Sequence, residues 1–126
     1  MLHHVSFGVA SLERSAAFYD AALGALGFTR VWSVPDAVGY GSPGGGDKLA
    51  IKAQAGPVAA PSARFHLAFR APSRGDVDGF YAAALAQGGQ DNGAPGLRAA
   101  YGPDYYAAFV IDPDGYRIEA VFKGPA

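Results

Sequence analysis

Two stretches of the chain, HVSFGVASLERSAAFYDAALGALGF at 4–28 and HLAFRAPSRGDVDGFYAAALAQGGQ at 66–90, are versions of one another. They are offset by 62 residues and share nine of 25 aligned positions without a gap. The identities pair His4 with His66 and Phe18 with Phe80, matches that an alanine-rich composition does not readily supply by chance. A repeat of this length predicts two copies of one structural module.

Each copy begins with a short apolar run, typical of a strand, and continues as a helix. Ser11 and Ser73 stand where a helix N-cap is expected, because a serine hydroxyl can accept a hydrogen bond from a free helix N–H. Apolar residues then recur at the spacing of one helix face. In the first copy these are Leu12, Ala16, Tyr19, Leu23 and Leu26, and in the second Val77, Phe80, Tyr81, Ala84 and Leu85. Gly27 and Gly88-Gly89 are expected to end the two helices.

Three short strands are expected after each helix, because β-branched and aromatic residues alternate with turn residues there. The expected strands are 29–34, 37–41 and 48–53 in the first copy, and 97–101, 105–111 and 116–122 in the second. The segment 55–62 (AGPVAAPS) is expected to link the modules. We therefore predict one α+β domain over 1–126, made of two tandem βαβββ modules (about 1–54 and 63–124), each a curved half-barrel sheet.

Composition excludes several classes of protein. The 126 residues contain no cysteine, which excludes disulfide scaffolds, thiolate metal sites and cysteine nucleophiles. The formal net charge of −1 gives no electrostatic basis for binding nucleic acid or an anionic membrane. No segment has the apolar length of a membrane span, and the N-terminal stretch lacks the features of a signal peptide. We expect a cytoplasmic protein.

The sequence DPDG at 112–115, between two apolar runs, predicts a tight hairpin. A type I turn with a glycine bulge pairs Asp112 with Tyr116. That register sets Glu119 opposite Phe109, with Ala107 and Tyr105 on the same face. A register shifted by one residue would put Tyr106 on that face instead.

Glu119 lies in the strand-like segment RIEAVF, where a carboxylate needs an explanation. A buried carboxylate requires a partner or a metal. The simpler interpretation is a surface position, or a salt bridge to Lys52 or Arg117. His4 and His66, however, occupy the same position of the two copies. Two imidazoles and a carboxylate form a ligand set for a divalent metal such as Fe, Mn, Ni or Zn, with positions left for a substrate.

The whole pattern resembles the glyoxalase, bleomycin-resistance and extradiol-dioxygenase superfamily, also called vicinal oxygen chelate. The resemblance rests on HVSFGVASLERSAAFY, FHLAFRAPS and DPDGYRIEAVF, and covers nearly the whole chain. It implies paired βαβββ modules around a metal site whose ligands are His4, His66 and Glu119. It also implies a homodimer in which each metal site takes His4 from one chain and His66 and Glu119 from the other.

Departures from the family pattern narrow the expected chemistry. Aligning the last strands of the modules puts Lys52 at the place of Glu119, where glyoxalase I enzymes carry a carboxylate that serves as ligand and base. True glyoxalase I activity is therefore not expected, unless Gln54 takes that place. Phe109 stands where the extradiol-dioxygenase signature has a tyrosine. Fosfomycin-type transferases share the three ligands, but no phosphonate-binding cluster is evident.

Several further residues are candidates for the site. Glu119 and Tyr105 are assigned catalytic roles, since a phenol near the metal could donate a hydrogen bond to an oxyanion. Arg70 is four residues after His66, so both are expected on the same face of the strand, and Arg70 could bind a substrate carboxylate. Trp32, Tyr40 and Tyr101 are candidate walls of the substrate pocket, although aromatic residues in short strands are commonly ordinary core.

We thus expect a metal-dependent enzyme acting on a small substrate with vicinal oxygens, by lyase, isomerase or related chemistry. The alternatives are a bleomycin-resistance-type protein that binds its ligand without catalysis, and a ring-cleaving dioxygenase of the extradiol type.

Overall fold

The computed structural model describes all residues, 1–126, and has the predicted α+β architecture of two βαβββ modules. The first module comprises β1 (Val5–Val9), α1 (Leu12–Gly24), β2 (Thr29–Val34), β3 (Ala37–Gly41) and β4 (Leu49–Ala53). The second comprises β5 (Leu67–Arg70), α2 (Arg74–Ala86), β6 (Gln90–Leu97), β7 (Tyr105–Ile111) and β8 (Arg117–Lys123). A short 3₁₀ helix, Ala99–Tyr101, separates β6 from β7.

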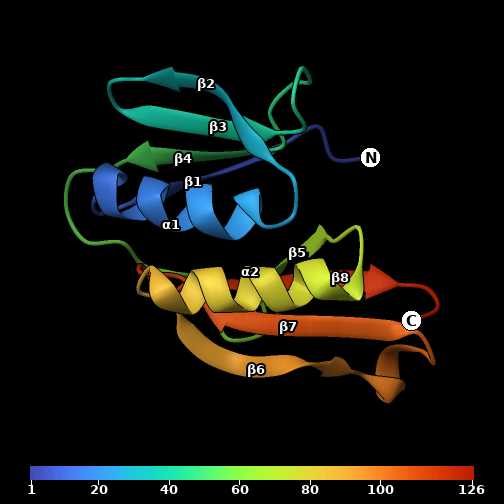
Figure 1. Cartoon of the computed structure of the whole chain (residues 1–126). Helices are drawn as coiled ribbons and strands as arrows, with labels where there is room; N and C mark the ends of the chain where they lie inside the picture. Colours follow the sequence, from blue (N-terminus) through green and yellow to red (C-terminus); the bar gives the residue numbers. More distant parts are fainter.

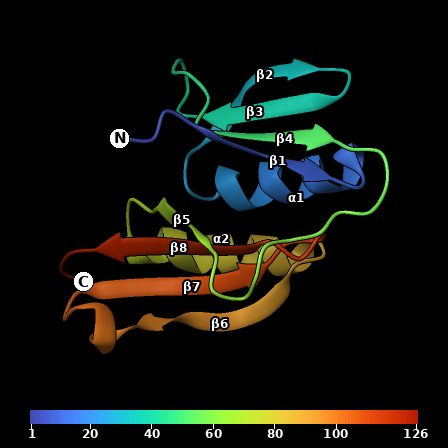
Figure 2. The same cartoon turned by 180° about the vertical axis from the view of Figure 1, so that it is seen from behind.

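Each module forms its own open four-stranded sheet, ordered β1-β4-β3-β2 in the first and β5-β8-β7-β6 in the second. In both sheets the first strand runs parallel to the last, and the remaining pairs are antiparallel. The repeat seen in the sequence is therefore a repeat of topology. Figures 1 and 2 show the two modules stacked, with α1 and α2 side by side on one side of both sheets.

Serine caps start both helices as predicted. The Ser11 hydroxyl accepts a hydrogen bond from Arg14 N at 3.2 Å, and the Ser73 hydroxyl accepts one from Asp76 N at 3.1 Å. Ala16, Tyr19, Leu23 and Leu26 of the expected α1 face are buried, and Val77, Phe80 and Ala84 of α2 join them in one continuous core. Leu12 and Tyr81 pack against this core only partly buried, and Leu85, also expected on the α2 face, is exposed. The core fills the space between the helices and the covered face of each sheet. The opposite face of each sheet has no helix on it (Figure 2).

The strand expected at 97–101 is the one misplaced element. The corresponding strand, β6, lies earlier, at Gln90–Leu97, and the expected segment contains the 3₁₀ helix. β6 has the sequence QDNGAPGL, whose glycine, proline, aspartate and asparagine have low strand propensity. It is tolerated because β6 is an edge strand, and its register against β7 is broken by two irregularities.

The β7–β8 hairpin has the predicted register. Asp112 N donates to Tyr116 O at 2.8 Å, and Gly115 adopts a φ of +98°, as the turn requires. Glu119 lies opposite Phe109, and Ala107 opposite Val121. Because successive side chains alternate between faces, Tyr105, Phe109 and Glu119 share the face without a helix.

Candidate functional site

Glu119 is the centre of the site. Its side chain points to the helix-free face of the second sheet but is only 1 % exposed. Ala68 of β5 lies beside it on one side and Phe109 of β7 on the other. This burial rules out the surface position that the sequence left open.

Two side chains contact the Glu119 carboxylate, one at each oxygen. His66 Nε2 lies 2.9 Å from Oε1, and the Tyr105 hydroxyl donates a hydrogen bond to Oε2. Neither Lys52 nor Arg117 forms an ion pair with it. The His66 imidazole is 48 % exposed, so the buried carboxylate and the accessible imidazole together open toward solvent.

Tyr105 is held as a proton donor. Burial and the adjacent Glu119 carboxylate raise the pKa of the Tyr105 phenol well above its ordinary value, because both disfavour the phenolate. The phenol therefore keeps its proton at neutral pH. Tyr101, on the 3₁₀ helix, packs edge-on against the Tyr105 ring with centroids 5.2 Å apart.

Phe109 extends the site along β7. Its ring lies 6.2 Å from the His66 ring, centroid to centroid, in an edge-on arrangement. A phenylalanine here means that the position associated with extradiol dioxygenases brings no hydroxyl to the site. The phenol beside Glu119 comes instead from Tyr105, four residues earlier on the same face.

His4 is not part of this cluster within one chain. It precedes β1 at the junction of the modules, where it lines a cavity together with Leu67, Ala68 and Phe69 of β5. Its Nδ1 lies 2.8 Å from Nδ1 of His3. No group of three histidine, aspartate or glutamate side chains converges within the chain. The predicted three-ligand set is therefore represented in one chain by His66 and Glu119 alone.

The other predicted site residues lie apart from Glu119. Tyr40 is 1 % exposed, and its hydroxyl donates to Asp20 Oδ1 at 2.8 Å, which makes it a core residue. Burial raises the pKa of the Tyr40 phenol, and the hydrogen bond to Asp20 adds to this. Trp32 lies across Gly39 of the first sheet, so closely that a Cβ at Gly39 would meet the indole at 2.3 Å.

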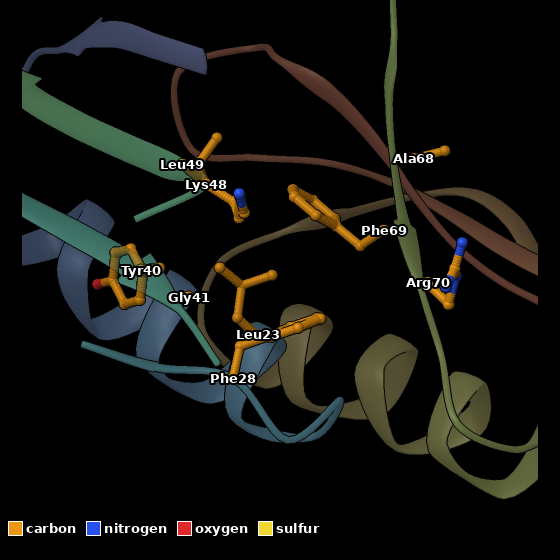
Figure 3. Close-up of a pocket in the computed structure, with 9 residues that line it drawn as sticks. All are labelled: Leu23, Phe28, Tyr40, Gly41, Lys48, Leu49, Ala68, Phe69 and Arg70. Carbon is orange, nitrogen blue, oxygen red and sulfur yellow. The ribbon is translucent and has the colours of Figure 1, made fainter. Parts of the chain in front are cut away.

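Arg70 lies at the junction of the modules. Together with Lys48 it lines a largely apolar cavity of about 200 Å³, formed by the end of α1 and by β3, β4 and β5 (Figure 3). Figure 3 shows the Phe69 side chain projecting into this cavity between the two modules, whereas the Arg70 side chain extends on the opposite side of β5. Arg70 thus shares a sheet face with Glu119 but lies further along it.

The structure corrects the position assigned to Lys52. Val5 pairs with Leu49 and Leu67 with Ile118, and Val5 and Leu67 are equivalent in the repeat. The counterpart of Glu119 is therefore Ala50, two residues before Lys52. The alignment of the last strands was wrong because it matched residue types without the pairing to β1 and β5. The first module still contributes no carboxylate at this place.

Two aspartates that the sequence indicated only as turn residues hold the hairpin against the first module. Asp112 accepts hydrogen bonds from the Tyr19 hydroxyl at 2.6 Å and from Tyr116 N at 2.9 Å. Asp114 accepts from the Ser15 hydroxyl at 3.1 Å and forms a salt bridge with Arg14 at 3.0 Å. This network, which we call the hairpin latch, fixes the turn five residues before Glu119.

Comparison with known proteins agrees with this architecture. Residues 1–120 match the model of the glyoxalase/bleomycin resistance protein/dioxygenase superfamily, and the chain belongs to that superfamily. Its fold is similar to a glyoxalase/bleomycin resistance protein from Albidiferax ferrireducens T118, with 36% identity, 98% of each chain covered and a TM-score of 0.81.

Two more distant structures share the fold. One is a glyoxalase-related enzyme from Fulvimarina pelagi, with 23% identity, a TM-score of 0.75 and 98% and 88% of the two chains covered. The other is the fosfomycin resistance protein FosX from Mesorhizobium loti, with 20% identity, a TM-score of 0.69 and 99% and 92% covered. No curated protein matches the chain. None of its helices is both long and apolar enough to cross a bilayer.

Proposed function

We propose that the protein is a metal-dependent enzyme that acts on a small substrate with two vicinal oxygens. The metal would be held by His66 and Glu119 of one chain and His4 of a second copy. The observation that carries the proposal is the pairing of a 1 % exposed carboxylate with a half-exposed imidazole on a sheet face that no helix covers.

The donor set fits a divalent ion of the Fe, Mn, Ni or Zn type. Two atoms that bind one ion at about 2.1 Å each lie roughly 3 Å apart at neighbouring positions. His66 Nε2 and Glu119 Oε1 are separated by 2.9 Å. Carboxylate and imidazole with open positions are typical of catalytic sites for such ions. A bound ion would supply Lewis-acid stabilisation of an enolate or oxyanion.

The chain's own residues have separate tasks in this proposal. Tyr105 keeps a proton on its hydroxyl and orients the Glu119 carboxylate through the hydrogen bond to Oε2. Glu119 then keeps Oε1 for the ion beside His66 Nε2. Phe109 supplies apolar surface beside His66, and Tyr101 supplies it beside Tyr105.

A second copy is required because His4 lies apart from His66 and Glu119 within one chain. His4 is exposed and precedes β1, so a partner could receive it without unfolding any element. We therefore infer a homodimer with two sites, each shared between the chains. The lack of a carboxylate at Ala50 argues against glyoxalase I chemistry, and we propose another lyase, isomerase or related reaction.

Metal content of the protein purified without a histidine tag tests the proposal. Wild-type protein should bind about one divalent ion per chain after dialysis against a metal mixture. Glu119→Gln should lose most of it, because the amide carries no charge and binds such ions weakly. Glu13→Gln, at the only other glutamate of the chain, is the matched control.

Equal metal content in wild type and Glu119→Gln would contradict the proposal. It would favour a bleomycin-resistance-type binding protein, whose ligand affinity is indifferent to a chelator. Oxygen consumption with catechols and Fe(II) would instead identify ring cleavage, the other alternative.

A further inference from the structure

Arg98 has an unusual position for a residue that the sequence did not single out. It follows β6 directly, and its backbone N donates to Tyr105 O at 2.8 Å. Its side chain turns back over the sheet, where the guanidinium carbon lies 5.4 Å from the centre of the Phe109 ring. One phenyl ring thus separates the guanidinium from His66, which packs against the same ring.

The strand beneath Arg98 is shaped to accommodate it. A Cβ at Gly96 would lie 3.1 Å from Nη1 of Arg98, and a Cβ at Gly93 would lie 3.2 Å from Nη2. Both distances are shorter than ordinary van der Waals contact, so the two glycines leave the space that the guanidinium fills. The carbonyl of Ala94 accepts a hydrogen bond from Nη2 at 2.6 Å. Arg98 is therefore held at a defined place.

The charge of Arg98 has no counter-ion within the chain. The two Arg–Asp ion pairs and the His66–Glu119 contact involve other residues, and Ala94 O satisfies one of the five N–H donors of the guanidinium. A half-buried, oriented guanidinium beside a phenyl ring is a receptor for a planar anion, because its paired N–H groups match the two oxygens of a carboxylate.

We propose that Arg98 is a specificity-determining residue that binds a carboxylate of the substrate. The substrate class is then a small monocarboxylate whose vicinal oxygens face His66 and Glu119, and whose body lies along Phe109. This inference rests on the proposed function for the position of the oxygens. It assigns to Arg98 the carboxylate-binding role that the sequence suggested for Arg70.

The test uses two probes that differ by the carboxylate alone: 3,4-dihydroxybenzoate and catechol. Their dissociation constants are measured calorimetrically for the Mn(II)-supplemented protein and again after treatment with a chelator. Wild type should bind 3,4-dihydroxybenzoate at least about 10-fold more tightly than catechol, the effect expected of one charge-assisted hydrogen-bonded pair. Arg98→Gln should abolish this preference and leave the catechol constant unchanged.

Three further variants sharpen the result. Arg98→Lys should retain part of the preference, because it keeps the charge but not the paired donors. Gly96→Ala should weaken the preference by displacing the guanidinium, whereas Gly46→Ala, where a Cβ meets nothing within 4 Å, should not. Lys52→Gln, at an exposed position of β4 without an ion pair, is the charge control.

The inference is overturned if wild type shows no preference for the carboxylated probe, including the case in which neither probe binds, or if Arg98→Gln weakens both equally. Comparing the dissociation constants with and without the chelator distinguishes failure of this inference from failure of the proposed function. A preference that depends on Arg98 but is the same with and without metal supports the inference and contradicts metal dependence. Binding that depends on metal but not on Arg98 supports the proposed metal dependence and contradicts the inference about Arg98.

Discussion

Glu119 shows how the sequence context of a single residue can indicate a candidate functional site. Burying a glutamate within an otherwise apolar strand costs desolvation free energy unless the carboxylate has partners. The sequence indicated that it needed a partner, and the hairpin register correctly placed Tyr105 on its face. The contact with His66 also follows from the sequence, once β5 is known to run beside β8.

Tyr105→Phe tests the hydrogen bond to Glu119. The variant keeps the ring but leaves Oε2 without its donor, so the free energy of unfolding should fall by about 1–2 kcal/mol. Urea denaturation measures this as a lower midpoint with an unchanged slope. Tyr101→Phe is the control, because no side-chain hydrogen bond of Tyr101 is present and its ring is 63% exposed. A similar loss in both variants would contradict the assigned role.

Other residues could not be placed from the sequence. Lys52 was misassigned because residue type alone does not define register, which is set by the pairing of β4 with β1. Arg98 gave no signal, since its position depends on space left by Gly93 and Gly96 in an edge strand whose register is irregular. Tyr40 and Trp32 have aromatic side chains that fit a pocket wall or a core equally well.

At the scale of elements, the β7–β8 hairpin is the part that the sequence predicted best. Turn chemistry and alternation are local properties, so DPDG determines its register without reference to the rest of the fold. The hairpin latch is different: Asp112 and Asp114 contact α1, about a hundred residues away in the sequence. Such contacts cannot be inferred from local pattern.

Asp114→Ala tests the hairpin latch. The truncation removes the partner of Ala10 N, Ser15 Oγ and Arg14, and should lower the free energy of unfolding by about 2–3 kcal/mol. Differential scanning calorimetry measures the change. Asp104→Ala, at an exposed turn that precedes β7, should cost less than about 0.5 kcal/mol. If the two variants were equally stable, the hairpin latch would have no energetic role.

A second cluster joins α1 to β2 and β3 and makes stability depend on pH. Burial acts to raise the pKa of Asp20, but hydrogen bonds from Arg30 and Tyr40 outweigh it, and the pKa is lowered. A lowered pKa in the folded state means that Asp20 stabilises the fold above its ordinary pKa of about 3.9. This contribution is lost as the pH falls through the folded value.

Asp20→Asn should therefore show a pH-dependent difference from wild type. The difference in free energy of unfolding should be constant above about pH 5 and should shrink progressively below about pH 4. Urea denaturation at a series of pH values measures it. A difference that stayed constant down to about pH 2 would contradict the role of the charge. A difference that grew on acidification would mean that the pKa is raised instead.

At the scale of the whole molecule, the internal repeat predicted the architecture, since each module is a complete βαβββ unit. It could not predict how the modules stack, which depends on the packing of α1 against α2. The stacking leaves one face of each sheet without a helix (Figure 2). Within one chain His4 does not join His66 and Glu119 in a three-ligand cluster. The shared site of a homodimer is the proposal that reconciles the ligand set with this arrangement.

Mixing two variants that each bind little metal tests most directly the claim that the site is shared between two chains. His4→Ala and Glu119→Gln should each bind little metal alone. Unfolded together at equal concentration and refolded, they should recover about a quarter of the wild-type metal content, because about half of the dimers contain both variants and each of these has one intact site of two. His3→Ala mixed with Glu119→Gln is the control and should bind about half of the wild-type content, since half of its chains carry an intact Glu119. A mixture of His4→Ala and Glu119→Gln that binds no more metal than either variant alone would contradict the shared site.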